Sequence, residues 1–188
     1  MGAEQAKHIT VPVPPPLREL EEFYSAAAAQ APVLEMIDGS TMPDPYRRLL
    51  VHDGDMTPAL EQFHGGSIHL QVLRSKRLHD KYSRDVVLRM DGSNKPIEFG
   101  AIEINLDAVC AGARDAILEG RKPLGGILRD FSIQHLSRPK AYFRVTADAV
   151  ICRTLEISNP AERLFGRRNT LSIPGGMVLA EIVEILPP

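Results

Sequence analysis

The stretch Phe165-Gly-Arg-Arg-Asn-Thr-Leu171, followed by Gly175-Gly176 and the apolar run from Met177 to Leu186, decides the fold. Two glycines between two strand-like runs indicate a tight reversal, so the runs are predicted to be antiparallel strands. The last run is apolar enough for a buried strand, yet it contains Glu181 and Glu184. A charged carboxylate inside an apolar strand is costly unless it is paired or faces water. The tail is therefore a candidate for function.

Strand geometry limits what this tail can supply to one site. Successive side chains of a strand point to opposite faces of the sheet. Glu181 and Glu184 therefore cannot share a face in a regular strand, and only one of Arg167 and Arg168 can face a given pocket. We expect the tail to supply one carboxylate and at most one arginine.

The middle of the chain also has β patterning. Residues 67–74 alternate apolar and polar side chains, and residues 84–90 form a second strand-like run. The segment Asp91-Gly-Ser-Asn-Lys-Pro96 is rich in turn residues, which predicts a hairpin into residues 97–106. The apolar positions of this third run change phase in its middle, which predicts a β-bulge near Gly100.

The order of the predicted elements indicates the fold class. Three helical segments come first, hairpin-linked strands follow, and one longer helical segment interrupts them. This order favours an α+β fold with a mainly antiparallel sheet over a βαβ repeat. We predict an extended N-terminal arm over residues 1–16 and a single domain over residues 17–188. The helical segments are 17–29, 46–51, 59–63 and 107–118, and the remaining strand-like runs are 132–136, 141–157, 169–173 and 177–186.

Composition excludes several classes of function. The net charge is −2, and no aromatic residues alternate with the basic pairs, so the sequence does not predict nucleic-acid binding. Two cysteines, Cys110 and Cys152, fit a reducing compartment, and the six histidines show no metal-ligand spacing. No run is long enough to span a membrane, and residues 1–10 are polar with no apolar stretch after them. We expect a cytoplasmic protein without a metal, and its oligomeric state stays open.

Arg84 is the basic residue that most invites a functional interpretation, because it begins an otherwise apolar strand-like run. In one interpretation it pairs with a surface carboxylate, a contact worth about 0–1 kcal/mol. In the other, its guanidinium points into a pocket and binds a ligand carboxylate through two hydrogen bonds. The residue type alone leaves both open.

Taken together, these segments resemble the chorismate pyruvate-lyase (4-hydroxybenzoate synthase) family and its wider relatives. The resemblance rests on the order of several short motifs, which are Leu50 to Phe63, Arg84-Asp-Val-Val-Leu88 with Asp91-Gly92 after it, Lys122-Pro-Leu-Gly125, and Phe165 to Leu171 followed by a glutamate in the last strand. It implies an α+β domain with helices on one side of an antiparallel sheet and helical flaps over an internal ligand pocket.

The resemblance also implies a reaction and a site. Members of the family eliminate pyruvate from chorismate without a cofactor, and by resemblance this chain would give 4-hydroxybenzoate or a close isomer. By resemblance, Glu181 and Arg84 are catalytic, and Glu184 is the alternative carboxylate because the register of the last strand is ambiguous. The implied substrate-binding residues are Arg84, Leu124, Gly125 and Arg168.

Two features leave a different function open. Relatives often carry a second arginine after the glycine that matches Gly100, where this chain has Ala101. The same scaffold also resembles the effector-sensing domains of bacterial transcription regulators, although the first 50 residues do not resemble a DNA-binding helix-turn-helix. The alternative is therefore a non-catalytic domain that binds a small aromatic carboxylate.

Overall fold

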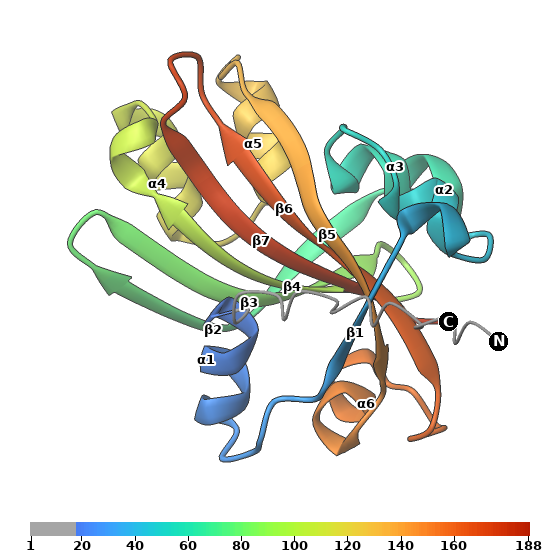
Figure 1. Cartoon of the computed structure of the whole chain (residues 1–188). Helices are drawn as coiled ribbons and strands as arrows, with labels where there is room; N and C mark the ends of the chain where they lie inside the picture. The colour runs from blue at the N-terminus through green and yellow to red at the C-terminus, as the bar shows by residue number, and fades with distance from the viewer. Residues whose placement is uncertain (1–17) are drawn as a thin grey trace, which may run out of the picture.

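The computed structural model describes residues 18–188, which form one antiparallel sheet of seven strands and six α-helices (Figure 1). The strand order is β1-β5-β6-β7-β4-β3-β2. This arrangement confirms the predicted α+β class and antiparallel sheet. The predicted extended arm, residues 1–16, lies outside the described residues.

The strands are β1 Leu34–Ile37, β2 Ile68–Leu78, β3 Lys81–Met90, β4 Pro96–Asn105, β5 Leu136–Thr146, β6 Arg163–Ser172 and β7 Val178–Leu186. The helices are α1 Arg18–Ala26, α2 Tyr46–Leu50, α3 Met56–His64, α4 Ala111–Glu119, α5 Leu124–Asp130 and α6 Ala149–Leu155.

Local turn chemistry forms the predicted hairpins. Gly92 and Asn94, between β3 and β4, have φ values of 79° and 57°, and Gly175 and Gly176, between β6 and β7, have φ values of 95° and 87°. These left-handed conformations favour glycine and asparagine. Strand β4 pairs with β7, which joins the two hairpins into one sheet.

The predicted bulge near Gly100 is wrong. The β3–β4 register shifts between Leu88 and Arg89 instead, and the pairing around Gly100 is regular. Strand β4 is buried on both faces, so apolar residues occupy positions on each face. The apparent change of phase follows from this burial. A strand covered on both sides does not show a simple alternation.

The prediction of strand for residues 132–136 and 141–157 needs correction. A single strand, β5, covers Leu136–Thr146, and Ala149–Leu155 forms helix α6. The Asp148 carboxylate starts this helix, since it accepts hydrogen bonds from the amides of Val150 and Ile151, each at 2.9 Å. The short edge strand β1 was not predicted.

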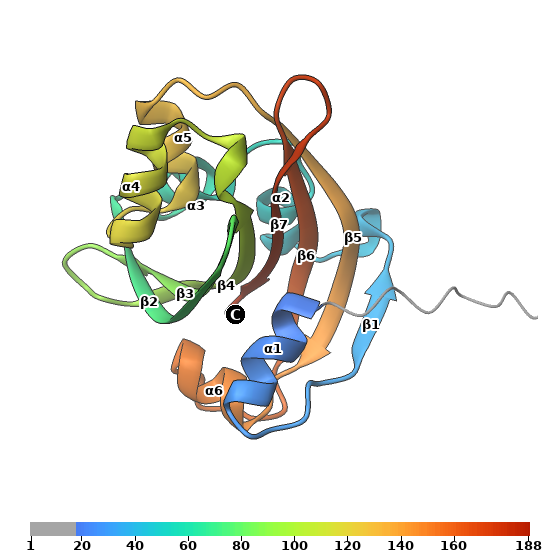
Figure 2. The same ribbon diagram turned by 90° about the vertical axis from the view of Figure 1, so that its left-hand side faces the viewer.

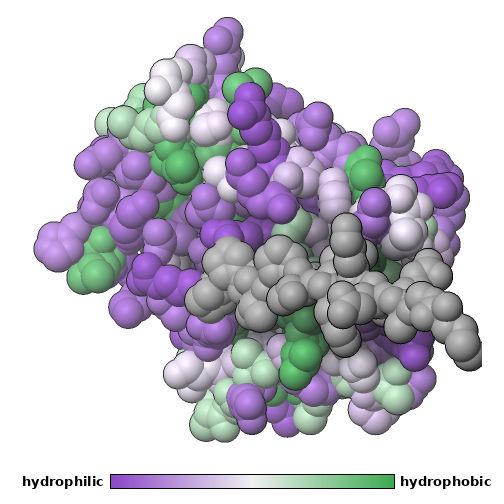
Figure 3. All heavy atoms as spheres, viewed as in Figure 1, coloured by the Kyte–Doolittle hydropathy of each residue, from purple (hydrophilic) through white to green (hydrophobic). Residues whose placement is uncertain are grey.

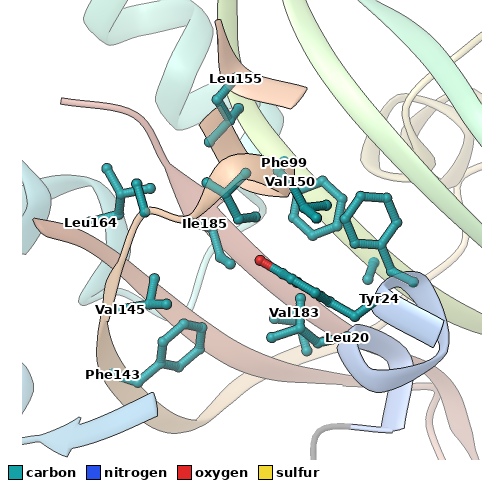
Figure 4. Close-up of a cluster of buried hydrophobic side chains, with 14 residues drawn as sticks. Leu20, Tyr24, Phe99, Phe143, Val145, Val150, Leu155, Leu164, Val183 and Ile185 are labelled. Atoms are coloured by element: carbon teal, nitrogen blue, oxygen red, sulfur yellow. The ribbon is translucent and has the colours of Figure 1, made fainter. Parts of the chain in front are cut away.

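Helices pack against one face of the sheet and further helices lie over the opposite face, in agreement with the arrangement that the resemblance implied. Helices α1 and α6 pack against one face, which we call the α1 face, around a hydrophobic cluster that includes Phe99 and Val183 (Figure 4). In Figure 4, Leu20 and Tyr24 of α1 and Val150 of α6 point toward the same strands. This packing makes the α1 face a closed core.

The opposite face, which we call the cavity face, carries α2, α3, α4 and α5 (Figure 2). Two hydrophobic clusters hold these helices to the curved sheet, one around α4 and α5 and the other around α2 and α3. On the outer surface in Figure 3, hydrophobic residues are scattered among hydrophilic ones. Between residues 18 and 188, no helix is both long and apolar enough to cross a membrane.

Candidate functional site

A cavity lies on the cavity face between the sheet and the beginnings of α3 and α5. Its volume is about 60 Å³, which is room for several waters. Strands β3, β4, β6 and β7 form its floor, and most of its lining is apolar. An apolar enclosure with a few polar groups is typical of a small-molecule site.

Arg84 on β3 is one of these polar groups. It is 2% exposed, and its Nε and Nη1 atoms have no hydrogen-bond partner within residues 18–188. Its Nη2 atom donates only a 3.5 Å hydrogen bond to the Lys122 carbonyl, just before α5. Burial lowers the pKa of Arg84 to about 10, so the group remains charged at neutral pH. A buried guanidinium with two free donors is well suited to an incoming anion.

Glu184 and Arg167 form a buried ion pair beside the cavity. Glu184 lines the cavity, and Arg167 Nε donates to Glu184 Oε2. Arg167 is 0% exposed. Its other nitrogens donate to the carbonyls of Leu50, His52 and Gly54 at 3.1, 3.0 and 3.3 Å. Arg167 therefore holds the segment before α3 to the sheet. All three of its guanidinium nitrogens donate hydrogen bonds within the protein.

Glu98 on β4 is a second carboxylate in the cavity lining, and the sequence analysis missed it. It is 4% exposed, and its Oε2 atom has no partner within the described part of the chain. Burial raises its pKa well above the ordinary value, and the nearby Glu184 adds to this, while Arg167 opposes it. A charged residue in the apolar run Pro96-Ile-Glu-Phe-Gly100 was the available signal.

Two short helices, α3 and α5, lie over the cavity, and two of the predicted site residues are at the start of α5. Leu124 and Gly125 line it at the start of α5, and α3 and α5 contact each other. Asp55, just before α3, also lines the cavity, and its Oδ1 atom lies 2.9 Å from Nε2 of His135. This contact ties the start of α3 to the segment that leads into β5.

Glu181 and Arg168, two of the predicted site residues, do not line the cavity. They belong to strand positions that point to the α1 face, in register with Thr170 and Val183. Glu181 Oε2 accepts a 2.9 Å hydrogen bond from Thr170 Oγ1 and lies 3.5 Å from Arg168 Nη2. The structure therefore brings Arg84, Leu124, Gly125 and Glu184 together, and places Glu181 and Arg168 on the other side of the sheet.

Ala101 also points to the α1 face and is 0% exposed. Its neighbour Gly100 lines the cavity between Arg84 and Glu98 along β4. The cavity thus contains one cation with free donors, Arg84, among the residues that the structure describes.

A curved antiparallel sheet with helices over an internal cavity defines the chorismate lyase-like fold, and this chain has that fold. The effector domain of PhnF from Mycobacterium smegmatis is similar, with a TM-score of 0.54, 12% sequence identity, and coverage of 71% of this chain and 88% of that domain. A longer PhnF structure has the same TM-score of 0.54 and 12% identity, and the match covers 72% of this chain and 64% of the PhnF chain. The SA0254 gene product of Staphylococcus aureus has a TM-score of 0.51 at 10% identity, covering 64% of this chain and 83% of that one.

At such low identities, the likeness shows the fold alone. No protein-family model and no curated protein sequence matches the chain. The function therefore has to be argued from the cavity.

Proposed function

We propose that this chain binds a small organic carboxylate in the cavity, with Arg84 as the anchor. The observation that carries the proposal is the guanidinium of Arg84, which is 2% exposed and has two nitrogens without partners among residues 18–188. A buried charge without a partner destabilises a folded protein. A bound carboxylate would supply both the missing charge and the missing acceptors.

The solved structures with this fold support a binding role. One of them is an effector domain, that of PhnF. By analogy, this chain would sense its ligand without converting it, and the two helices over the cavity are the elements that ligand binding would order. Since the analogy rests on fold alone, the cavity residues carry the specific part of the proposal.

A second candidate is the elimination of pyruvate from chorismate. The observation in its favour is a carboxyl group of raised pKa, Glu98, in the same cavity as Arg84. Arg84 would hold the ring carboxylate, while Glu98 or Glu184 would take up the ring proton as the C–O bond to the enolpyruvyl group breaks.

Charge balance favours binding over this lyase reaction. Chorismate carries two carboxylates, and the cavity has one cation with free donors, because Arg167 is engaged by Glu184 and by three carbonyls. Glu98 adds a further carboxyl close to Glu184. Like charges in a desolvated cavity repel. A second ligand carboxylate would therefore find no free cation in the cavity and would lie near the Glu184 carboxylate, whereas a monocarboxylate needs only Arg84.

One pair of measurements separates the two functions. Benzoate and 4-hydroxybenzoate are titrated into the protein by calorimetry, and release of pyruvate from chorismate is followed in parallel. Binding without turnover, weakened at least about tenfold by Arg84→Gln, supports the binding role. Turnover that Arg84→Gln abolishes supports the lyase. Lys81→Gln, a half-exposed cation on the same strand, is the matched control. Absence of both binding and turnover would refute both functions.

A further inference from the structure

Glu98 and Arg84 are two buried charged side chains that line one cavity, each with polar atoms that lack a partner among residues 18–188. The proposed function uses only Arg84. Glu98 has no role in it, although burying a carboxyl group without a partner is costly. An unpaired acceptor of this kind indicates that the ligand has a second polar group.

The strand register places the two groups at opposite ends of the cavity floor. Arg84 pairs with Ile102, and Leu88 pairs with Glu98. Four residues along a strand correspond to about 13 Å between the Cα positions. A ligand that contacts both groups therefore needs two polar ends separated by an apolar body.

Gly100 keeps the middle of this floor open. It lies between the two positions along β4, where an added Cβ would meet Val86 at 3.1 Å and the Glu98 carboxylate oxygen at 3.5 Å. The floor on either side is apolar, formed by Val86, Leu88 and Ile102. These side chains would contact the apolar body of a ligand that joins the two polar ends.

Among residues 18–188, the end of the cavity near Glu98 has more carboxyl groups than cations. Two carboxyl groups, Glu98 and Glu184, share one guanidinium, that of Arg167, which donates to Glu184 and to carbonyls within residues 50–54. A ligand hydroxyl would give Glu98 a hydrogen bond and no counter-charge. A ligand ammonium group would give it both, and charge-assisted hydrogen bonds are about twice as strong as neutral ones.

We propose that Glu98 determines specificity for an amino-bearing carboxylate, which binds with its carboxylate on Arg84 and its protonated amine on Glu98. This inference rests on the proposed binding function and adds the class of ligand. It also predicts proton release. Burial raises the pKa of the Glu98 carboxyl and so favours its protonated form in the empty cavity. Formation of the ion pair with the ammonium group sends that proton to solvent.

The experiment compares three ligands that differ at one end only, titrated by calorimetry into the whole chain at pH 7. The ligands are 4-(aminomethyl)benzoate, 4-(hydroxymethyl)benzoate and 4-methylbenzoate. We expect the amine to bind about ten to a hundred times more tightly than the methyl compound. Its binding enthalpy should depend on the ionisation enthalpy of the buffer, because protons are released. Glu98→Gln should bring the ratio of affinities close to one.

Controls separate a failure of this inference from a failure of the binding function. Glu103→Gln alters a carboxylate on the same strand that faces the α1 side and pairs with Lys81 at 3.5 Å, and it should leave the ratio unchanged. If the three ligands bind equally, or if the hydroxyl compound binds best, the inference is overturned while carboxylate binding stands. If no compound binds and Arg84→Gln changes nothing, the binding function itself is refuted. The ligand series on the unaltered protein decides the inference even if Glu98→Gln does not fold.

Discussion

Replacing Arg84 with methionine should stabilise the ligand-free protein and abolish carboxylate binding. Burial lowers the pKa of Arg84 by more than two units, to about 10. At about 1.36 kcal/mol per pKa unit, holding the charged group in the fold costs about 3 kcal/mol. Below pH 10 the guanidinium is charged in both the folded and unfolded chains, so this cost is fully present at pH 7. It decreases only as the pH rises above about 10, toward the ordinary pKa of arginine.

Methionine retains the apolar stem and removes the unpaired charge. Part of the gain is lost because methionine fills less space than arginine. We therefore expect the free energy of unfolding of Arg84→Met to exceed that of the unaltered protein by about 1–3 kcal/mol, which corresponds to a rise in Tm of several degrees. Urea denaturation at pH 7 measures the free energy, and calorimetry with 4-(aminomethyl)benzoate measures binding.

Two further variants sharpen this test. Lys81→Met removes a half-exposed cation from the same strand and should change the free energy of unfolding by less than about 0.5 kcal/mol. Arg84→Lys keeps a charge in the cavity without the planar fork, so it should bind carboxylates weakly and show no comparable stabilisation. If Arg84→Met is less stable than the unaltered protein by more than about 1 kcal/mol, Arg84 is a structural residue and the argument for an anion site is refuted.

Three other predictions follow from contacts around the cavity. Arg167→Met leaves Glu184 buried without its partner and should lower the free energy of unfolding by about 3–5 kcal/mol in urea denaturation. Hydrogen bonds to the Ile133 carbonyl and to Asp55 outweigh burial and raise the pKa of His135, so their stabilising contribution is complete below pH 6.5 and is lost as the pH rises through the raised pKa. Amide hydrogen exchange of α3 should accelerate over that range, and His135→Gln should remove the pH dependence. An added Cβ in Gly166→Ala would clash with the backbone carbonyl of Glu184, so this variant should lower the free energy of unfolding by at least about 2 kcal/mol, whereas Gly126→Ala, at an open position, should not.

Local chemistry explains which parts of the fold the sequence could predict. Turn residues such as Asp91-Gly92 and Gly175-Gly176 determine hairpins by themselves, so the antiparallel sheet was predictable. Helix α6 was not, because seven largely apolar residues fit a buried strand equally well. Only the cap formed by Asp148 distinguishes the two, and a capping residue is a weak signal within an apolar run.

The site was predictable only in part, for a different reason. Parity within one strand correctly separated Glu181 from Glu184 onto opposite faces, but it could not say which face holds the cavity. That depends on the partners of β7, where Glu184 lies opposite Gly100 and Glu181 lies opposite Glu103. These partners come from a strand about eighty residues earlier in the chain, so the pairing is a property of the tertiary structure.

Cross-strand pairing also explains why the two ends of the cavity carry different polar groups. Residues opposite each other on adjacent strands share a face. The row of Gly100, Glu184 and Arg167 is electrically balanced, with Arg84 on one side of it along the strands and Glu98 on the other. The floor therefore carries a guanidinium at one end, a neutral pair in the middle and a carboxyl group at the other end. A shift of β4 by one residue would move Glu98 to the α1 face and remove this polarity. The orientation of a ligand in this cavity is thus a consequence of strand register, and reversing the charges at positions 84 and 98 together should reverse it.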